Sequence, residues 1–359
     1  MSDHLLDTLV FQSGHQMQNR FGLAPMTNHQ SGEDGTATED EIHWLKMRAE
    51  GNYGMVMSCA AHVSAEGQGF PRQLGVFSDD HSAGLRKISA ALGSTFSVIQ
   101  LHHGGIRSPK KLIGQDPVGP SAHAETGARA MTTEEVQQVV SDFITSAVRV
   151  EQAGFDGVEI HGAHGYLLAQ FMSEELNLRE DQYGGSYENR TRIVREIIDG
   201  ICEACSENFS VGLRLSAEGN GMTLEHVTRF CQELLNEATI DYLDISLWDS
   251  FKEPAEEGYQ GRSLLSYFTE LRRGKVKLGV AGKIQTPQDA EQIISEGVDF
   301  VLLGKYGIFH HDYPKLYAEN PRFEIASIPV TADYLRTQGV SENFITYLSK
   351  WDGLMSKEE

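Results

Sequence analysis

The sequence predicts an α/β protein in which eight parallel strands form a TIM-type (β/α)8 barrel. Short apolar runs alternate with amphipathic helical segments along most of the chain, which is typical of a parallel sheet covered by helices. The chain has 359 residues, and this exceeds a barrel of about 250 residues by an amount that insertions and a tail can fill. We expect residues 1–321 to form the barrel with an N-terminal hairpin, and residues 322–359 to form a helical extension packed on it.

The first half of the chain contains the candidate hairpin and the early strands. Leu9–Phe11 and Phe21–Ala24 flank a polar stretch, so we expect them to pair as a hairpin that closes the bottom of the barrel. Apolar runs predict buried strands at Met55–Ser58, Ser97–His103 and Val158–Ile160.

Helix starts are predicted from capping residues that precede apolar rows. Thr38 with Glu41, and Thr132 with Glu135, have the spacing of a capping box. Further helices are expected to begin at or after Ser78, Ser186, Thr223 and Thr286.

The second half of the chain repeats the alternation. Strands are expected at Val211–Leu215, Tyr242–Leu247, Val276–Ala281 and Phe300–Leu303. The charged and aromatic segment Trp248–Arg262 is expected to be a loop at the carboxyl ends of the strands, where it can form a wall of a pocket.

Composition disfavours several classes of partner. Lys plus Arg number 30 and Asp plus Glu 51, so the net charge is 30 − 51 = −21, and we expect neither nucleic acid nor an anionic membrane as a partner. No apolar run is long enough to span a bilayer, and the N-terminus does not resemble a signal peptide. A cytoplasmic protein with a small-molecule substrate is expected, and a homo-oligomer remains open.

Four cysteines are too few for a disulfide framework in a chain of this length. Cys202 and Cys205 are spaced as CxxC, but no second pair completes a metal site, so we interpret them as core thiols. Cys59 is interpreted as a small buried side chain rather than a redox thiol.

Chemistry is concentrated directly after the Val158–Ile160 strand. His161, His164 and Tyr166 leave the end of one strand together. Two imidazoles three residues apart can grip an oxygen that gains negative charge, and a phenol held close can donate a proton. Paired histidines are also metal-ligand spacing, but the stretch is not HExxH and no carboxylate lies between them. We therefore expect no metal.

The stretches HGAHGYLLAQFMS and DQYGGSYENRTR together resemble the signature of the old yellow enzyme family, the FMN-dependent NAD(P)H:flavin oxidoreductases. The resemblance extends over about residues 19 to 310. It implies that His161 and His164 hold the substrate oxygen and that Tyr166 is the proton donor.

The same resemblance implies a set of cofactor-binding residues. The end of the first strand would lie against the flavin, Gln100 would contact the pyrimidine edge of the ring, and Arg214 would stabilise the negative charge of reduced FMN. Glycines after the seventh and eighth strands would expose N–H groups to the phosphate. The full set is Pro25, Met26, Thr27, Ala60, Gln100, Arg214, Gly282, Gly304 and Lys305.

Three positions depart from the pattern of the family. His29 stands where several relatives carry a substrate-contacting tyrosine, so it is a candidate substrate-binding residue. Ile106 precedes Arg107, where relatives have arginine one residue earlier. Lys305 stands in place of arginine and supplies a point charge without a forked donor.

The reaction implied by the resemblance is an alkene reduction. Hydride passes from NADH or NADPH to FMN and then to an electron-poor alkene of the enone type, while His161 and His164 polarise the oxygen and Tyr166 adds the proton. A flavin-linked demethylase or an NADH oxidase could use the same FMN site. A metal-dependent hydrolase or aldolase barrel and a catalytically inactive flavin-binding module are the remaining alternatives.

Overall fold

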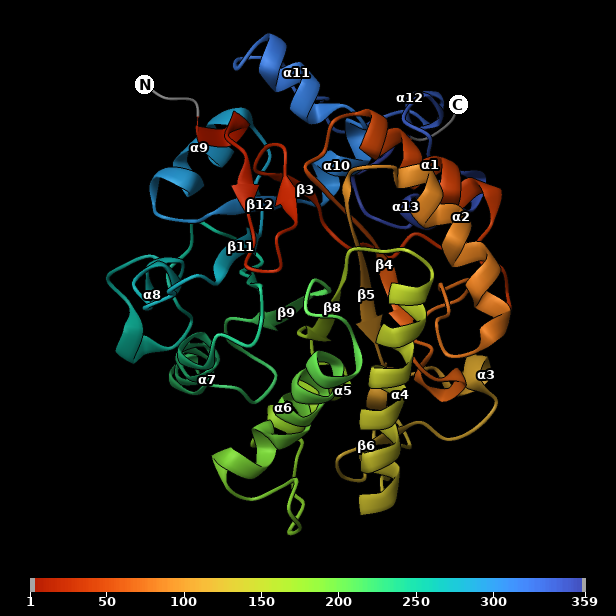
Figure 1. Cartoon of the computed structure of the whole chain (residues 1–359), viewed down its shortest axis with the longest axis vertical. Helices are drawn as coiled ribbons and strands as arrows, with labels where there is room; N and C mark the ends of the chain where they lie inside the picture. Colours follow the sequence, from red (N-terminus) through yellow and green to blue (C-terminus); the bar gives the residue numbers. More distant parts are fainter. Residues whose placement is uncertain (1–3, 357–359) are drawn as a thin grey trace.

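The computed structural model describes residues 4–356. Within them, eight parallel strands close into a barrel in the order β3, β4, β5, β8, β9, β10, β11 and β12, with helices around it (Figure 1). The predicted TIM barrel is therefore confirmed. The barrel strands are β3 (Phe21–Leu23), β4 (Met55–His62), β5 (Phe96–His102), β8 (Gly157–Gly162), β9 (Ser210–Ser216), β10 (Tyr242–Ser246), β11 (Lys277–Ala281) and β12 (Phe300–Leu303).

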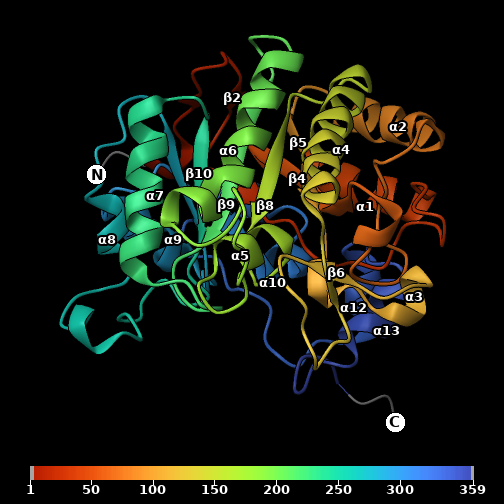
Figure 2. The same cartoon turned by 90° about the horizontal axis from the view of Figure 1, so that it is seen from below.

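Helices cover the outside of the barrel. Figure 2 shows strands β4, β5, β8, β9 and β10 in the middle, with α7 and α8 to one side and α1, α2 and α4 to the other. The helices are α1 (Glu39–Glu50), α2 (Ser82–Leu92), α3 (Lys110–Ile113), α4 (Thr133–Gln152), α5 (Leu167–Met172), α6 (Tyr187–Ala204), α7 (Leu224–Glu237), α8 (Ser266–Thr269), α9 (Pro287–Ser295), α10 (Lys305–Phe309), α11 (Tyr313–Glu319), α12 (Ala332–Thr337) and α13 (Glu342–Leu348). No helix between residues 4 and 356 is long and apolar enough to cross a membrane.

Side chains along a barrel strand point alternately towards the surrounding helices and into the barrel interior. In β8, Val158 and Ile160 belong to the apolar layer between barrel and helices. Because successive side chains point to opposite faces of a strand, Glu159 and His161 face the barrel interior. All six residues of β8 are buried. The strand thus buries polar groups inside the barrel and delivers His161 to its carboxyl end.

The bottom of the barrel is closed by Phe11, whose ring centroid lies 4.9 Å from that of Phe96, 5.8 Å from that of Tyr242 and 6.0 Å from that of Phe300. These three partners begin β5, β10 and β12.

The predicted pairing of the N-terminal hairpin is wrong. Its actual strands are β1 (Leu9–Val10) and β2 (Gln16–Met17), which pair antiparallel, with Gly14 in the turn at φ +93°. Phe21–Leu23 pairs in parallel with β4 and β12 instead. The chain turns back within the polar stretch, earlier than expected, so Leu9–Val10 pairs with Gln16–Met17. Phe21–Leu23 is then the first strand of the barrel.

The predicted capping boxes are present in part. The Thr132 hydroxyl accepts from the Glu135 N–H at 3.2 Å, and the Glu135 carboxylate accepts from the Thr132 N–H at 2.8 Å. Thr38 accepts from the Glu41 N–H. Glu41 does not return the contact, because its buried carboxylate accepts from the Ser31 hydroxyl. The Glu41 side chain therefore ties the loop after β3 to α1.

The prediction that Cys202 and Cys205 are core thiols is wrong. Cys202 is exposed and Cys205 is half-buried at the C-cap of α6, because both fall outside the inner row of that helix. Cys59 and Cys231 are buried, as expected for Cys59.

The C-terminal segment packs on α1. The Phe344 ring meets the Trp44 ring edge-on at 5.2 Å between centroids, and the buried Arg48 guanidinium donates to the carbonyls of Gln338 at 2.7 Å and Gly307 at 3.2 Å. Helices α12 and α13 are thereby attached beside the carboxyl ends of the barrel strands. The boundary between residues 1–321 and 322–359 stays a prediction.

Candidate active site

The candidate site lies at the carboxyl ends of the barrel strands. His161 is on β8, and His164 and Tyr166 follow in the turn before α5. His164 has φ +59° and Gly165 φ +67°. A Cβ at Gly165 would lie 2.7 Å from the Asn220 side chain, so this left-handed turn needs glycine there. The turn brings the three predicted side chains together.

The aromatic rings of the site form one cluster. The His161 ring centroid lies 5.1 Å from that of His164 and 5.2 Å from that of Tyr166. His102, at the end of β5, meets the Tyr166 ring edge-on at 4.4 Å. The His164 ring is held by Ser246, whose Oγ lies 2.8 Å from Nε2. Four rings from two neighbouring strands thus brace one another.

Both predicted oxygen-binding histidines are neutral. Burial, followed by the charges of Arg214 and Arg107, lowers the pKa of His164 to about 3. Burial also lowers the pKa of His161 well below its usual value. The His161 Nδ1 atom accepts the Ala163 N–H at 3.3 Å, which places the ring proton on Nε2. His161 can therefore offer an N–H donor without carrying charge.

The Tyr166 hydroxyl is available to a ligand. The side chain is half-buried and lines a cavity. Within residues 4–356, no hydrogen-bond partner of this hydroxyl is found. A donor placed at a cavity wall without an internal acceptor can transfer its proton to a bound molecule.

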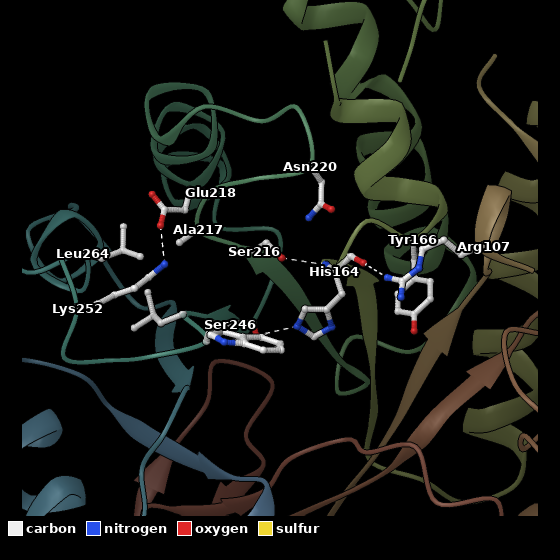
Figure 3. Close-up of a pocket in the computed structure, with 12 residues that line it drawn as sticks. Arg107, His164, Tyr166, Ser216, Ala217, Glu218, Asn220, Ser246, Lys252 and Leu264 are labelled. Atoms are coloured by element: carbon white, nitrogen blue, oxygen red, sulfur yellow. Dashed lines mark hydrogen bonds and ion pairs between the residues drawn. The ribbon is translucent and has the colours of Figure 1, made fainter. Parts of the chain in front are cut away.

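Two cavities meet at this cluster. One, of about 500 Å³, is lined by Arg107, His164 and Tyr166 on one side and by Glu218 and Lys252 on the other (Figure 3), and Trp248 also lines it. The other, of about 600 Å³, runs towards β11, β12 and α13. His164, Ser246 and Trp248 line both. Each volume is within the range of small-molecule sites.

Seven of the nine predicted cofactor residues line the larger cavity. They are Pro25, Met26, Thr27, Arg214, Gly282, Gly304 and Lys305. Arg214 is on β9, five others lie in or at the segments that follow β3, β11 and β12, and Lys305 begins α10, so distant parts of the chain converge on one space.

The far end of the larger cavity fits a phosphate. Lys305 is half-buried there, and no carboxylate pairs with it in the part of the chain that the structure describes. The backbone N–H groups of Gly304 and Lys305 likewise find no acceptor among residues 4–356. A Cβ at Gly282 would lie 3.1 Å from the backbone of Trp248, so glycine permits the close approach of two loops. Unpaired donors and a cation suit the phosphate of FMN.

The remaining two cofactor residues lie deeper. Ala60 on β4 and Gln100 on β5 are direct neighbours in the sheet, and neither lines the two cavities. The Gln100 Nε2 atom donates to Glu159 at 2.7 Å, so the amide donor predicted to face the flavin is engaged in the barrel interior.

Arg214 is paired, and its partner is Asp244. The Arg214 Nε atom lies 3.0 Å from Asp244 Oδ2, with both side chains at most 5% exposed. Glu218, four residues after Arg214 in the sequence, contacts Lys252 at 2.6 Å instead. The angle of the Arg214 to Asp244 contact is too poor for a hydrogen bond, so we treat it as an ion pair that leaves guanidinium donors for the cavity.

His29 does not line either cavity. Its ring stacks on Tyr347 at 4.5 Å and on Phe70 at 5.5 Å. Tyr347 is the side chain that reaches the larger cavity. His29 therefore supports a side chain of the cavity wall, and its direct contact with a substrate stays a prediction.

Sequence reasoning missed the part of the wall that comes from the C-terminal segment. Phe344, Tyr347, Leu348 and Trp351 line the larger cavity. Their spacing of three and four residues indicates one helix face, but the spacing does not say which surface that face covers. Ser246 was also missed, because a serine at a strand end carries no distinctive signal.

The barrel, the cavities at its carboxyl end and the phosphate-binding features fit a flavin-dependent oxidoreductase. A model of the NADH:flavin oxidoreductase / NADH oxidase family matches residues 9–320, and the chain belongs to that family. It is an FMN-dependent oxidoreductase that uses NADH or NADPH. Membership in this family decides against a metal-dependent hydrolase.

The chain is similar to curated relatives of two lengths. It is 38% identical over 314 residues to a probable NADH-dependent flavin oxidoreductase of Bacillus subtilis, which covers 84% of each chain. It is 34% identical over 325 residues to an NADH oxidase of Thermoanaerobacter brockii, covering 86% of this chain and only 50% of that protein. The chain thus spans about half the length of the second relative.

Solved structures resemble the whole barrel. An old yellow enzyme homologue from Zymomonas mobilis matches with a TM-score of 0.81 and 25% identity, over 94% of this chain and 99% of that one. Morphinone reductase in complex with tetrahydroNAD matches with a TM-score of 0.77 and 26% identity, over 93% and 94%.

Proposed function

We propose that this FMN-dependent oxidoreductase reduces electron-poor alkenes of the enone type, with Tyr166 as the proton donor. The observation that carries the proposal is that His164 and Tyr166 both line the smaller cavity, with the buried, neutral His161 ring packed against both of them. FMN, when bound, would supply hydride chemistry, with NADH or NADPH as the source of the hydride.

The two histidines have the role of oxygen ligands. A neutral imidazole N–H stabilises the oxygen of an enone more as negative charge develops on it, so the gain is largest in the transition state. The pKa of His164 is lowered to about 3, which keeps this donor neutral across the physiological pH range. His161 and His164 therefore polarise the substrate without themselves being proton donors.

Tyr166 supplies the proton that balances the hydride. The hydride adds to the β-carbon, the phenol proton adds to the α-carbon, and the C=C double bond becomes a single bond. The phenolate that remains is reprotonated from solvent, because the cavity beside Tyr166 is open.

The positions of the predicted residues support the cofactor roles that we propose for them. Lys305, Gly282 and Gly304 would hold the phosphate, and Arg214 would face the side of the ring that becomes negative. Pro25, Met26 and Thr27 would lie along the ring. Ala60 and Gln100 would support it from the adjacent strands, with Gln100 contributing its carbonyl oxygen.

The test is Tyr166→Phe, measured in separate half-reactions. Reduction of the flavin by NADH should stay within about 2-fold of the wild type, whereas reoxidation by cyclohex-2-enone should slow by about 10²–10⁴-fold, the usual contribution of a general acid. Tyr187→Phe is the matched control, because that hydroxyl contacts Glu233 away from the site. Equal losses in both half-reactions would contradict the proton-donor role.

Oxygen is the competing acceptor, because the family description includes NADH oxidases. Consumption of NADH in air should be slower than consumption in the presence of the enone without oxygen. If NADH were instead consumed faster in air than with the enone, and if Tyr166→Phe changed neither rate, the result would favour an NADH oxidase.

A further inference from the structure

Arg107 occupies the mouth of the smaller cavity. It ends the short 3-10 helix Gly105–Arg107, which follows β5. Ile106 before it is 7% exposed, and its backbone N–H donates to Gln170 at 3.0 Å. Because position 106 is used for packing, the side chain at position 107 turns outwards to the cavity.

The guanidinium of Arg107 lies on the proton donor. Its carbon atom is 4.5 Å from the centre of the Tyr166 ring, and its Nη1 atom donates to the backbone carbonyl of His164. Figure 3 shows Arg107 and Tyr166 stacked beside His164. A guanidinium has five N–H donors, and this contact uses one of them. The others remain for a ligand at the reacting end of the site.

Arg107 forms no ion pair with a carboxylate of residues 4–356, in contrast to the second cation of the same cavity. That cation, Lys252, lies 2.6 Å from Glu218. The Glu218 carboxylate also accepts the Ala255 N–H at 2.9 Å, so it is fully engaged. In a chain of net charge −21, an exposed arginine without an ion pair at the mouth of a cavity creates a local attraction for anions.

We propose that Arg107 determines specificity by binding a carboxylate of the oxidising substrate, so that the preferred alkenes are enones that also carry an acid group. This inference rests on the proposed alkene reduction. The forked guanidinium matches a carboxylate through two parallel hydrogen bonds. Hydride and proton add across the C=C bond as before, and the carboxylate is unchanged.

Phosphates of NADH or NADPH are the other anions that could reach this cavity. The position of Arg107 favours the alkene, because the guanidinium lies against the ring of the residue that protonates it. A dinucleotide whose nicotinamide reaches the flavin carries its phosphates well away from the reacting atoms. The two sources are separated by measuring each half-reaction.

The experiment compares 4-oxopent-2-enoate with its methyl ester, which differs only by the charge and one methyl group. In the wild type, kcat/KM should be higher for the acid. Arg107→Gln should lower kcat/KM for the acid by about 10–100-fold, mainly through KM, and for the ester by no more than about 3-fold. For the acid, the kcat/KM of Arg107→Lys should lie between that of the wild type and that of Arg107→Gln. Lys110→Gln is the control, because it removes an exposed charge at the start of the neighbouring helix α3, outside the cavity.

A binding measurement separates this inference from the proposed function. The oxidised holoenzyme is titrated with 4-hydroxybenzoate and with its methyl ester, following the flavin absorbance. Arg107→Gln should raise the Kd for the acid and leave the Kd for the methyl ester nearly unchanged. Equal losses for acid and ester would assign Arg107 a purely structural role and overturn the inference, as would a loss confined to reduction by NADH or NADPH. If no enone were reduced at all, the alkene proposal would fall while the titration still decided on Arg107.

Discussion

Replacing Glu159 with Gln should make the stability of the protein less dependent on pH. Glu159 and Asp244 are both fully buried inside the barrel, and Arg214 is the cation that they face. Burial, followed by the charge of Asp244, raises the pKa of Glu159 to about 8. Burial also raises the pKa of Asp244 to about 6. Glu159 therefore keeps its proton near neutral pH, with Gln100 and Tyr242 beside it.

The magnitude follows from the proton that Glu159 holds. The ordinary pKa of a glutamate is 4.5, so between pH 4.5 and 8 the folded protein binds a proton that the unfolded chain has released. The stabilisation is complete below pH 4.5 and is lost as the pH rises through 8. For one proton the free energy of unfolding falls by about 1.4 kcal/mol per pH unit. From pH 6 to 8 the loss is roughly 2 kcal/mol, because the slope flattens near pH 8.

The assay is urea unfolding at pH 6, 7 and 8 with a fixed excess of FMN, since ligand binding itself adds to stability. Between pH 6 and 8, the free energy of unfolding of the wild type should fall by roughly 2 kcal/mol more than that of Glu159→Gln. Glu203→Gln is the control, because Glu203 is exposed on α6, and it should behave like the wild type. Parallel curves for the wild type and Glu159→Gln would refute the reasoning.

Three further substitutions test the cofactor site and the packing. Lys305→Met should raise the Kd for FMN by about 10–100-fold, because a charge-assisted contact worth about 1.5–3 kcal/mol is lost, and fluorescence titration checks this. Thr132→Ala removes the hydroxyl of a capping box and should lower the unfolding free energy by about 1 kcal/mol in urea titrations. Phe143→Ala empties a fully buried site on α4 and should cost about 3–5 kcal/mol in the same assay.

Local signals explain why most elements of the fold were predictable. Thr132 and Glu135 cap α4 through contacts three residues apart, and apolar rows recur at the period of a helix. Such interactions depend on a few neighbouring residues and so can be recognised from the sequence. The hairpin was predicted with the wrong partner, because Phe21–Leu23 can pair either with the nearby Leu9–Val10 or with two distant strands, and closing the barrel decides between them.

The candidate site likewise contains residues whose proximity the sequence predicted and residues whose proximity it did not. His161, His164 and Tyr166 lie within six residues, so one turn brings them together and their cooperation was predictable. The ion pair of Arg214 with Asp244 was not, because it depends on which strands become neighbours. The same is true of Tyr347, which reaches the larger cavity from α13 at the far end of the chain.

The sequence by itself determined the alternation of strands and helices and the cluster of residues after β8, because both depend on adjacent or periodically spaced residues. It also determined the acidic balance, which depends on composition alone. Tertiary structure alone decided which charges are paired and which are free. Glu218 neutralises Lys252, Asp244 neutralises Arg214, and Arg107 and Lys305 remain without a carboxylate among the described residues. The physical reason is that Coulomb attraction depends on distance in space, and folding sets that distance independently of separation along the chain.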